Sequence, residues 1–297
     1  MAAVLALDVG GTKLAGAVVG DDGAVIVEDR RPTAGADGEA LFGAVTELLA
    51  GVLDRAADLG VDRSSVVALG AGCGGPMTAG GEQVSPLNIP QWRGFPLRSR
   101  LADWSGLPTS VDNDAKALAV GEGWVGAAKG VRDYLAMVVS TGVGGGIVLD
   151  GRLLDGADGN AGHIGHVIVE PLGRACVCGA RGCLEAHASG TAIAAATGRP
   201  ASEATEEERV TAGRLVGRAV ASVSNLLDLR LAVVAGSVAL GFGDTFFDAA
   251  NDELGRSACL DYSRGGRIVP SGCGPQGPIV GAAAVGLRGV GRDVGVS

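Results

Sequence analysis

The sequence lacks an excess of positive charge, and this excludes one large class of function. Its 24 Lys and Arg residues are outnumbered by 33 Asp and Glu residues, which gives a formal net charge of −9. A surface that binds nucleic acid needs a Lys/Arg excess to displace counterions from the phosphates. We therefore expect no nucleic-acid partner, and any anionic small molecule would need a local site.

A long apolar run is lacking as well. No stretch approaches the roughly 20 apolar residues that a membrane span requires. The opening residues, MAAVLALDVGG, have no basic region and turn polar at Asp8, which is typical of a first strand and not of a signal peptide. We expect a cytoplasmic protein without a membrane partner, in a compartment that keeps thiols reduced.

What the sequence has is the composition of a folded protein with many turns. Hydrophobic residues make up 47% and charged residues 19%, there are 52 glycines, and no long polar tract is present. A chain of 297 residues is long enough for two domains of ordinary size, each with its own core.

A pattern of strands and glycine-rich turns occurs twice. In the first half, a buried strand at Val4–Leu7 leads through a glycine-rich turn into a strand at Leu14–Val19. In the second half, an apolar strand at Tyr134–Val139 leads through a glycine-rich turn at 140–146 into a strand at Ile147–Leu149. Two such meanders, each followed by helices, predict two related lobes whose turns face one cleft.

Other segments have simpler patterns. Apolar residues between Glu39 and Leu59 fall at helical spacing, which predicts an amphipathic helix, and a parallel strand is expected at Val66–Gly70. The stretch 76–108 contains several prolines and no sustained period, so we interpret it as a long functional loop or an inserted segment that crosses the edge of a pocket. The small-residue segment Gly277–Gly286 predicts a helix that packs back on the first lobe.

One short segment is crowded with metal-binding residue types. Residues 162–185 contain three of the six cysteines and two of the three histidines. Cys176, Cys178 and Cys183, with a histidine ten residues upstream, form a Cys3His set of the kind that holds a structural zinc ion. Because polar residues lie on both sides of the cysteines, the metal would fix a ligand pocket. The alternative is three reduced thiols in a loop.

The first glycine turn indicates a phosphate site. Asp8-Val9-Gly10-Gly11-Thr12-Lys13 lies between two predicted strands, where glycines let backbone N–H groups approach an anion and Thr12 and Lys13 add donors. Its spacing differs from that of a P-loop, which excludes that mechanism. A glycine hairpin alone is more often a structural turn, but a second such turn at Ser140–Gly145 favours the phosphate site.

Taken together, several motifs resemble the ROK family of sugar kinases: DVGGTK, VDNDAKAL, STGVGGG, GHIGH followed by CVCGARGCLE, and VVAGSVA. The resemblance covers nearly the whole chain. It implies a two-lobed α/β fold of the actin-like (hexokinase/ribonuclease H-like) ATPase type, with an interlobe cleft and a structural zinc loop. We expect a smaller lobe of residues 1–113 with the C-terminal helix of about 277–297, a larger lobe of residues 114–276, and a homodimer.

The resemblance also implies roles for named residues. Two glycine turns would clasp the phosphates of ATP, with Asp8 near Mg²⁺ through water, and a third turn would lie on the adenosine side. The cofactor residues are then Asp8, Gly10, Gly11, Thr12, Lys13, Thr141, Gly142, Gly144, Gly145, Gly236 and Ser237. The implied ligands of a structural Zn²⁺ are His166, Cys176, Cys178 and Cys183.

Asn113 and Asp114 are the predicted catalytic pair, because they follow an apolar strand and open a helix. Phosphoryl transfer asks little covalent chemistry of the protein, so one carboxylate that orients the sugar hydroxyl and accepts its proton is sufficient. Asp114 would be this base, and Asn113 would hold a neighbouring hydroxyl. The alternatives are Asp112 as the base, or an Asn/Asp helix cap without catalytic function.

Sugar recognition needs convergent donors and acceptors, because a buried unpaired polar group costs about 1–3 kcal/mol. The residues expected to provide them are Asn88, Asn113, Asp114, His163, His166 and Glu185. By resemblance, His166 would use one ring nitrogen for zinc and the other for a sugar hydroxyl. Asn88 lies between Pro86 and Pro90 and is equally explained as a turn residue.

His163 departs from the glucokinase pattern, which has Glu at this place. A carboxylate accepts from two adjacent hydroxyls at once, whereas a neutral imidazole offers one acceptor and one donor. Similar His-Ile-Gly-His sequences occur in bacterial N-acetylmannosamine kinases, so an N-acylated hexosamine is an alternative substrate to glucose. His163 is otherwise explained as a packing residue.

The sequence therefore predicts a kinase that transfers the γ-phosphoryl group of ATP to the 6-hydroxyl of glucose or a related hexose. Polyphosphate as donor stays open. A sugar-sensing transcriptional regulator is a competing hypothesis, but it would need an N-terminal winged-helix domain, and here the first strand begins by Val4. A catalytically silent sugar-binding protein is a third hypothesis, against which Asp8, Asn113 and Asp114 argue.

Overall fold

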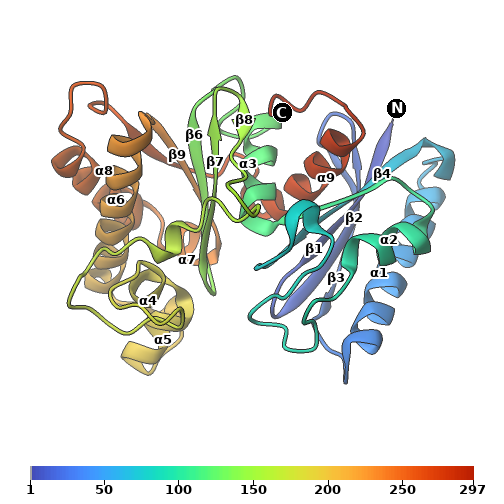
Figure 1. Ribbon diagram of the computed structural model, residues 1–297, viewed down its shortest axis with the longest axis horizontal. Helices are drawn as coiled ribbons and strands as arrows, with labels where there is room; N and C mark the ends of the chain where they lie inside the picture. Colours follow the sequence, from blue (N-terminus) through green and yellow to red (C-terminus); the bar gives the residue numbers. More distant parts are fainter. Residues whose placement is uncertain (1) are drawn as a thin grey trace.

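The computed structural model describes residues 2–297 and contains two five-stranded sheets (Figure 1). The first sheet has the order β3-β2-β1-β4-β5 and the second the order β10-β9-β6-β7-β8. The strands of the first are β1 (Ala3–Val9), β2 (Lys13–Gly20), β3 (Val25–Pro32), β4 (Val66–Cys73) and β5 (Thr109–Asn113). Those of the second are β6 (Tyr134–Val139), β7 (Val143–Leu149), β8 (Arg152–Leu153), β9 (Leu231–Ala235) and β10 (Arg267–Pro270).

The two sheets have the same connectivity, which confirms the internal repeat. In each sheet the first three strands form an antiparallel meander. The fourth strand then pairs in parallel with the first, and the fifth pairs in parallel with the fourth. This doubled arrangement is a mixed α/β, actin-like architecture.

Nine α-helices of the described residues 2–297 cover the sheets and connect their strands. They are α1 (Gly38–Asp58), α2 (Leu97–Ser105), α3 (Asp114–Trp124), α4 (Glu185–Ala188), α5 (Gly190–Thr197), α6 (Glu206–Leu227), α7 (Ser237–Phe242), α8 (Asp244–Ser257) and α9 (Gly277–Gly289). No helix in this part of the chain is long and apolar enough to cross a membrane.

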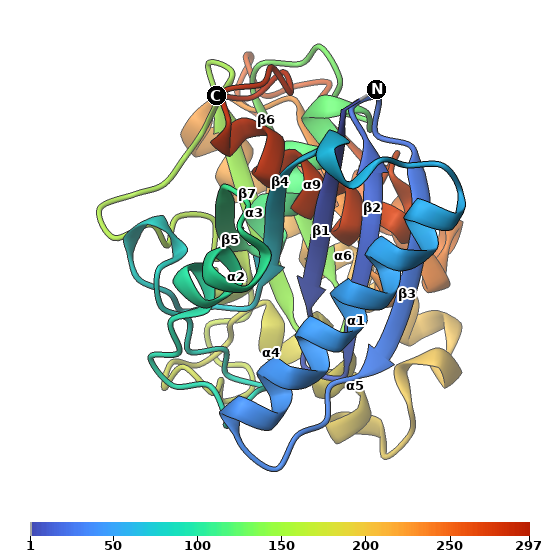
Figure 2. The same cartoon turned by 90° about the vertical axis from the view of Figure 1, so that its right-hand side faces the viewer.

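Helix α1 confirms the prediction from helical spacing. Asp37 caps it by accepting a hydrogen bond from the Ala40 N–H at 2.8 Å. Its apolar residues, among them Leu41, Val45 and Leu48, are fully buried in the core of the first lobe. The helix crosses the outer face of β1, β2 and β3 (Figure 2).

The segment 76–108 is more ordered than its sequence suggested. Val84 bridges Met77 and Phe95, and α2 follows. Trp92 is fully buried and stacks on Phe95 with ring centroids 4.6 Å apart. The predicted loop thus contains strand bridges and a helix, because aromatic side chains anchor the segment in the core of the first lobe without imposing a regular period.

The second glycine-rich turn is shorter than predicted, because β7 begins at Val143 and not at Ile147. Gly144 and Gly146 lie inside this strand, directly against α3. A Cβ built on Gly146 would lie 2.8 Å from the Cβ of Ala119. The glycines thus let a helix approach the strand closely, and the same composition that marks a turn serves packing here.

A core cluster between the two sheets joins the lobes. It combines residues of β1, β2 and β4 with residues of β6 and β9, and α3 and α9 contribute its middle (Figure 1). The predicted C-terminal helix is confirmed as α9, and it packs on β1 and β4 of the first sheet. The two helices meet at Gly121 and Gly281, where a Cβ on Gly121 would lie 2.9 Å from the Cα of Gly281.

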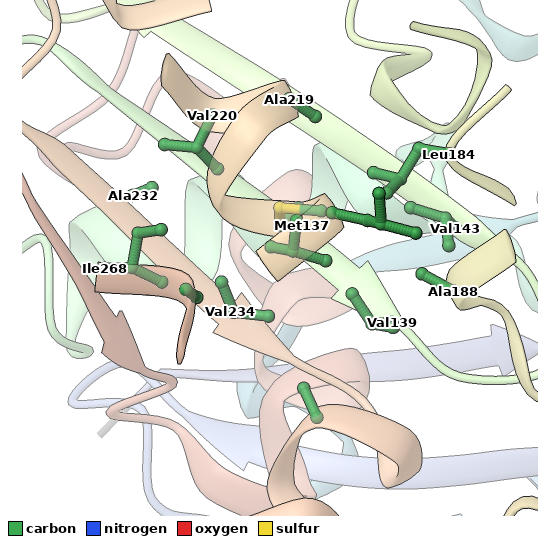
Figure 3. Packing of buried hydrophobic residues seen from close by; sticks show 14 of the residues in the cluster. Met137, Val139, Val143, Leu184, Ala188, Ala219, Val220, Ala232, Val234 and Ile268 are labelled. Atoms are coloured by element: carbon green, nitrogen blue, oxygen red, sulfur yellow. The ribbon is translucent and has the colours of Figure 1, made fainter. Parts of the chain in front are cut away.

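The outer face of the second sheet has its own core. Met137 and Val139 of β6 pack with Val220 of α6, and Leu184 and Ala188 close the same cluster (Figure 3). Leu184 follows the last of the three clustered cysteines directly. The cysteine segment is therefore anchored to a packed core on its C-terminal side.

The contact between α3 and α9 gives the first prediction. Gly281→Ala should lower the free energy of unfolding by about 3 kcal/mol, because its Cβ would lie 2.5 Å from the Ala117 carbonyl oxygen. The matched control is Gly51→Ala in α1, where nothing lies within 4 Å and helix propensity should raise stability by about 0.5–1 kcal/mol. Urea unfolding measures both. Equal effects of the two substitutions would contradict the close helix contact.

Candidate active site

The turn from β5 into α3 carries the predicted catalytic pair. Asn113 is the N-cap of α3, and its Oδ1 accepts from the backbone N–H of Ala115 at 3.0 Å and of Lys116 at 3.4 Å. The capping function is thus present, and it leaves the Nδ2 group of Asn113 to face Gly75. A Cβ built on Gly75 would lie 3.5 Å from that Nδ2 and 3.9 Å from Nε2 of His163. Asn113 and His163, distant in sequence, therefore border one space.

Asp8 and Asp114 both border Gly72. A Cβ on Gly72 would lie 3.7 Å from Oδ1 of Asp8 and 3.5 Å from Cα of Asp114. Burial, and next the nearby Asp114, raise the pKa of Asp8 from 3.8 to about 7. Burial also raises the pKa of Asp114, against the hydrogen bond from the Ala115 N–H and the charge of His163. A desolvated pair of acids at strand ends is typical of a catalytic site.

Asp112 is committed to other partners. Its Oδ1 accepts from the backbone N–H of Asn113 at 2.8 Å and lies 3.2 Å from Nζ of Lys116. Burial raises the pKa of Asp112, and the Lys116 ammonium and the Asn113 N–H offset part of that rise while they occupy Oδ1. This arrangement favours Asp114 over Asp112 as the base.

The first glycine turn has exposed residues and also packs closely against another segment. Gly11, Thr12 and Lys13 are exposed, and Gly10 closes the turn by donating its N–H to the Lys13 carbonyl oxygen at 3.0 Å. A Cβ on Gly11 would lie 2.7 Å from Cβ of Asn88. The turn therefore packs against the predicted sugar-binding residue Asn88, and Gly11 is required for that approach.

Glu185 is tied to the second glycine turn. Its Oε2 accepts from the backbone N–H of Val143 at 2.8 Å, and a Cβ on Gly142 would lie 2.8 Å from the same oxygen. One carboxylate oxygen is thereby used to hold the turn at Thr141 and Gly142, and the other is left for a ligand. Gly145 lies deeper, buried against Gly162.

The predicted adenosine-side turn lies beside the second glycine turn. The hydroxyls of Ser140 and Ser237 are 2.9 Å apart, and Thr191 donates its hydroxyl to the Thr141 carbonyl oxygen at 2.9 Å. Gly236 has φ of 101°, and a Cβ there would lie 2.3 Å from the Val139 carbonyl oxygen, so only glycine fits. Three loop segments thus form one connected surface.

His166 and the three cysteines are close enough to share one ion. Their ligand atoms all lie within 4.8 Å of one another. Nδ1 of His166 is 3.7 Å from Sγ of Cys176, and Sγ of Cys178 is 3.7 Å from Sγ of Cys183. A tetrahedral ion with bonds of about 2.3 Å would separate two sulfurs by about 3.8 Å. The residues therefore fit a tetrahedral metal with Nδ1 as the histidine ligand, which leaves Nε2 of His166 free.

The two histidines of the GHIGH motif stand side by side. Their rings are 6.2 Å apart with planes at 17°. Nδ1 of His163 lies 2.9 Å from the Asn160 carbonyl oxygen. A carbonyl only accepts, so Nδ1 carries the proton, and in the neutral ring Nε2 is an acceptor. The neutral His163 ring therefore presents a hydrogen-bond acceptor, Nε2, to the space beside Asn113.

Sequence reasoning missed the residues that hold the site together. Thr191 connects loops that are distant in the chain, and no local pattern marks it. Ser140 lies in the predicted glycine turn, but its bond to Ser237 was not predicted. Lys116 was missed too, although its spacing of four residues from Asp112 on a predicted helix start is the usual signal of an ion pair.

The repeated lobes, the paired carboxylates and the connected glycine turns define an ATP-dependent sugar kinase of the actin-like fold. The chain belongs to the ROK family, whose model matches residues 4–288.

Individual relatives agree with this assignment. An N-acetylmannosamine kinase from Citrobacter koseri is 39% identical over 257 residues, which cover 80% of this chain and 84% of that protein. The structure of a ROK glucokinase from Streptomyces griseus with glucose and AMPPNP has a TM-score of 0.82 at 29% identity, covering 96% of this chain and 99% of that one. A ROK hexokinase from Thermus thermophilus also has a TM-score of 0.82, at 33% identity, with 97% and 99% covered.

The raised pKa of Asp8 predicts a pH-dependent stability. The folded protein holds the Asp8 proton up to about pH 7, whereas the unfolded chain releases it near 3.8. Between these values the folded state binds more protons, so stability falls as pH rises, by a few kcal/mol at most. Asp8→Asn should therefore stabilise the metal-free protein at pH 8 and much less at pH 5, as measured by urea unfolding.

The control is Asp54→Asn, which removes an exposed carboxylate on α1. It should leave the pH profile of the free energy of unfolding unchanged. Parallel profiles for wild type and Asp8→Asn would show that burial of Asp8 does not shift its pKa.

Proposed function

We propose that this kinase transfers the γ-phosphoryl group of ATP to the 6-hydroxyl of a 2-acylamino hexose, with N-acetylmannosamine as the preferred acceptor. The observation that carries the proposal is His163, with its proton fixed on Nδ1 by Asn160 and its Nε2 facing the space beside Asn113. The similarity to N-acetylmannosamine kinases supports the same substrate. Glucose is the second candidate, supported by the likeness to glucokinase and hexokinase structures.

His163 suits an acylamino sugar because its imidazole lacks the second acceptor atom that a carboxylate would have. A carboxylate at this place would grip two adjacent hydroxyls, but a sugar with an amide at C2 offers only one hydroxyl at that end. A neutral imidazole with its proton on Nδ1 supplies a single acceptor, which matches one hydroxyl or one amide N–H. His166 adds a second imidazole nitrogen on the same side, because its Nδ1 faces the cysteines.

Asp114 is the proposed general base. Its pKa is raised by burial, which makes the carboxylate a better proton acceptor for a sugar hydroxyl at neutral pH. Asn113 is held rigidly by its capping bonds and presents its amide nitrogen to a neighbouring hydroxyl oxygen. Orientation of one hydroxyl by two fixed groups supplies much of what phosphoryl transfer requires from a protein.

The nucleotide side consists of the two glycine turns and Asp8. Mg²⁺, when bound with ATP, would neutralise charge on the transferring phosphoryl group. Asp8 lies at the end of β1 beside Asp114, so a cation there would also hold the Asp8 carboxylate in its charged form. Lys13 and Thr12 are exposed at the adjacent turn and are free to meet phosphate oxygens.

Zinc is the metal that best suits the Cys3His set. Thiolate and imidazole ligands at tetrahedral spacing favour Zn²⁺ over Mg²⁺ or Ca²⁺, which prefer oxygen. Burial raises the pKa of the Cys183 thiol to about 12, so a bound cation is what would stabilise its thiolate. The reduced thiols support a cytoplasmic location, and a homodimer remains our expectation for the assembly.

The assignment of the base gives a prediction. Asp114→Asn should lower kcat at least about hundred-fold because the proton acceptor is lost, while the sugar still binds. Asp112→Asn is the matched variant, and it should retain turnover. Steady-state kinetics and calorimetry with the sugar measure the two effects. Turnover that survives Asp114→Asn but is lost in Asp112→Asn would move the base to Asp112.

The substrate assignment is tested by a panel of acceptors. ADP release with Mg-ATP should give the highest kcat/KM with N-acetylmannosamine, above N-acetylglucosamine, mannose, glucose and glucosamine. His163→Glu should shift the preference toward glucose, because a carboxylate again grips two hydroxyls. Bound zinc is measured in each preparation as a control for an intact site. A wild-type enzyme that prefers glucose would overturn the acylamino assignment.

A further inference from the structure

Lys116 is a buried charge that the proposed reaction does not use. It lies in the first turn of α3 and is 2% exposed. Burying an ammonium group is costly unless acceptors replace its water, and lysine has three donor protons to satisfy. A buried lysine two residues from the catalytic base therefore requires an explanation.

Its Nζ meets three acceptors from two different parts of the chain. Asp112 Oδ1, at the end of β5, is 3.2 Å away. Asp155 Oδ1 is 2.5 Å away and the Gly159 carbonyl oxygen 3.2 Å away, both in the loop between β8 and the GHIGH motif. The ammonium thus connects the strand end that precedes Asn113 with a distant loop.

That loop is held by bonds of its own and by few from outside. The Ala161 N–H donates to the Asp155 carbonyl oxygen at 2.9 Å, and Nδ2 of Asn160 donates to the Asp158 carbonyl oxygen at 3.0 Å. Residues 155–162 contribute nothing to the hydrophobic clusters, and glycines at 156, 159 and 162 adopt positive φ. On one side it borders a pocket of about 410 Å³, which Asp112, Lys116 and Asp155 line together with Arg98 and Arg288. Among the described residues 2–297, Lys116 is the one side chain from outside the 155–163 segment that hydrogen-bonds to residues 155–160.

The loop ends at the residue that we propose reads the sugar. His163 takes its orientation from the Asn160 carbonyl oxygen, and Asn160 follows Gly159 directly. A shift of Gly159 therefore moves the acceptor that fixes the tautomer and ring plane of His163. A displacement of about 1 Å in such a positioning chain is enough to change substrate affinity strongly.

We propose that Lys116 is a positioning residue that braces the 155–163 loop against the catalytic turn and thereby sets affinity for the sugar. The inference rests on the proposed function, since it concerns the same sugar site. Lys116 touches no reacting group. It acts through Asp155 and Gly159 on His163, and through Asp112 on the start of α3.

Asp155→Asn tests the brace at its exposed end. The Asp155 side chain is 58% exposed, so its substitution should leave folding intact. We expect the KM for the sugar to rise roughly ten-fold with kcat changed less than about two-fold and the KM for ATP unchanged. Asp155→Glu should restore most of the sugar affinity because it keeps the charge.

Lys116→Met tests the other end of the same bond. Its KM for the sugar should rise at least as much, and adding Asp155→Asn should cost little more, because both changes remove one interaction. Lys129→Met, which removes an exposed lysine after α3, is the control and should match wild type. A purely structural lysine would instead reduce kcat and both affinities together with thermal stability.

Hydrogen exchange separates failure of this inference from failure of the proposed function. In sugar-free protein, Asp155→Asn should speed amide exchange across residues 155–163 and leave α3 unchanged. A wild-type enzyme inactive on every sugar of the panel would overturn the proposed function, while the exchange result would still decide the brace. Unchanged exchange, or an unchanged sugar KM in an active Asp155→Asn enzyme, would overturn the role of Lys116.

Discussion

The close packing of α3 between the two sheets is the constraint on which the rest of the structure depends. Glycines on two neighbouring elements allow this packing. Gly281 lets the backbone of α9 approach the backbone of α3, and Gly146 lets strand β7 approach α3. Because α3 contacts both sheets, its position fixes how the lobes stand relative to each other. Interiors packed at this density tolerate little displacement, so α3 is a rigid frame for whatever it carries.

What α3 carries is the proposed catalytic pair. Its N-terminus holds Asn113 by capping bonds and sets Asp114 near Asp8, and its first turn buries Lys116 against the loop that leads to His163. Two desolvated carboxylates and a buried ammonium cost stability, and the apolar core around α3 and α9 offsets that cost. The site is therefore preorganised by a helix that is itself held by the fold, which is how a kinase orients a hydroxyl without relying on loop motion.

Much of this could be predicted because it is local in the chain. Helix α1 follows from its apolar spacing, the doubled meander from repeated strands and turns, and the Cys3His set from ligands within a short segment. Contacts between residues that are distant in the chain have no local sequence pattern from which they could be predicted. Lys116 and Asp155 are 39 positions apart, and Glu185 and Val143 are 42 apart. The glycines of β7 were predicted to belong to a turn, because turns and closely packed strands both favour glycine.

The most direct test of the account is a crystal structure of the protein with N-acetylmannosamine and a non-hydrolysable ATP analogue. We expect the sugar 6-hydroxyl within hydrogen-bond distance of the Asp114 carboxylate and Nε2 of His163 facing the C1–C2 end of the sugar. The phosphates of the analogue should lie between the two glycine turns. A 6-hydroxyl placed on Asp112, or a sugar bound away from the Asn113–Asp114 turn, would contradict it.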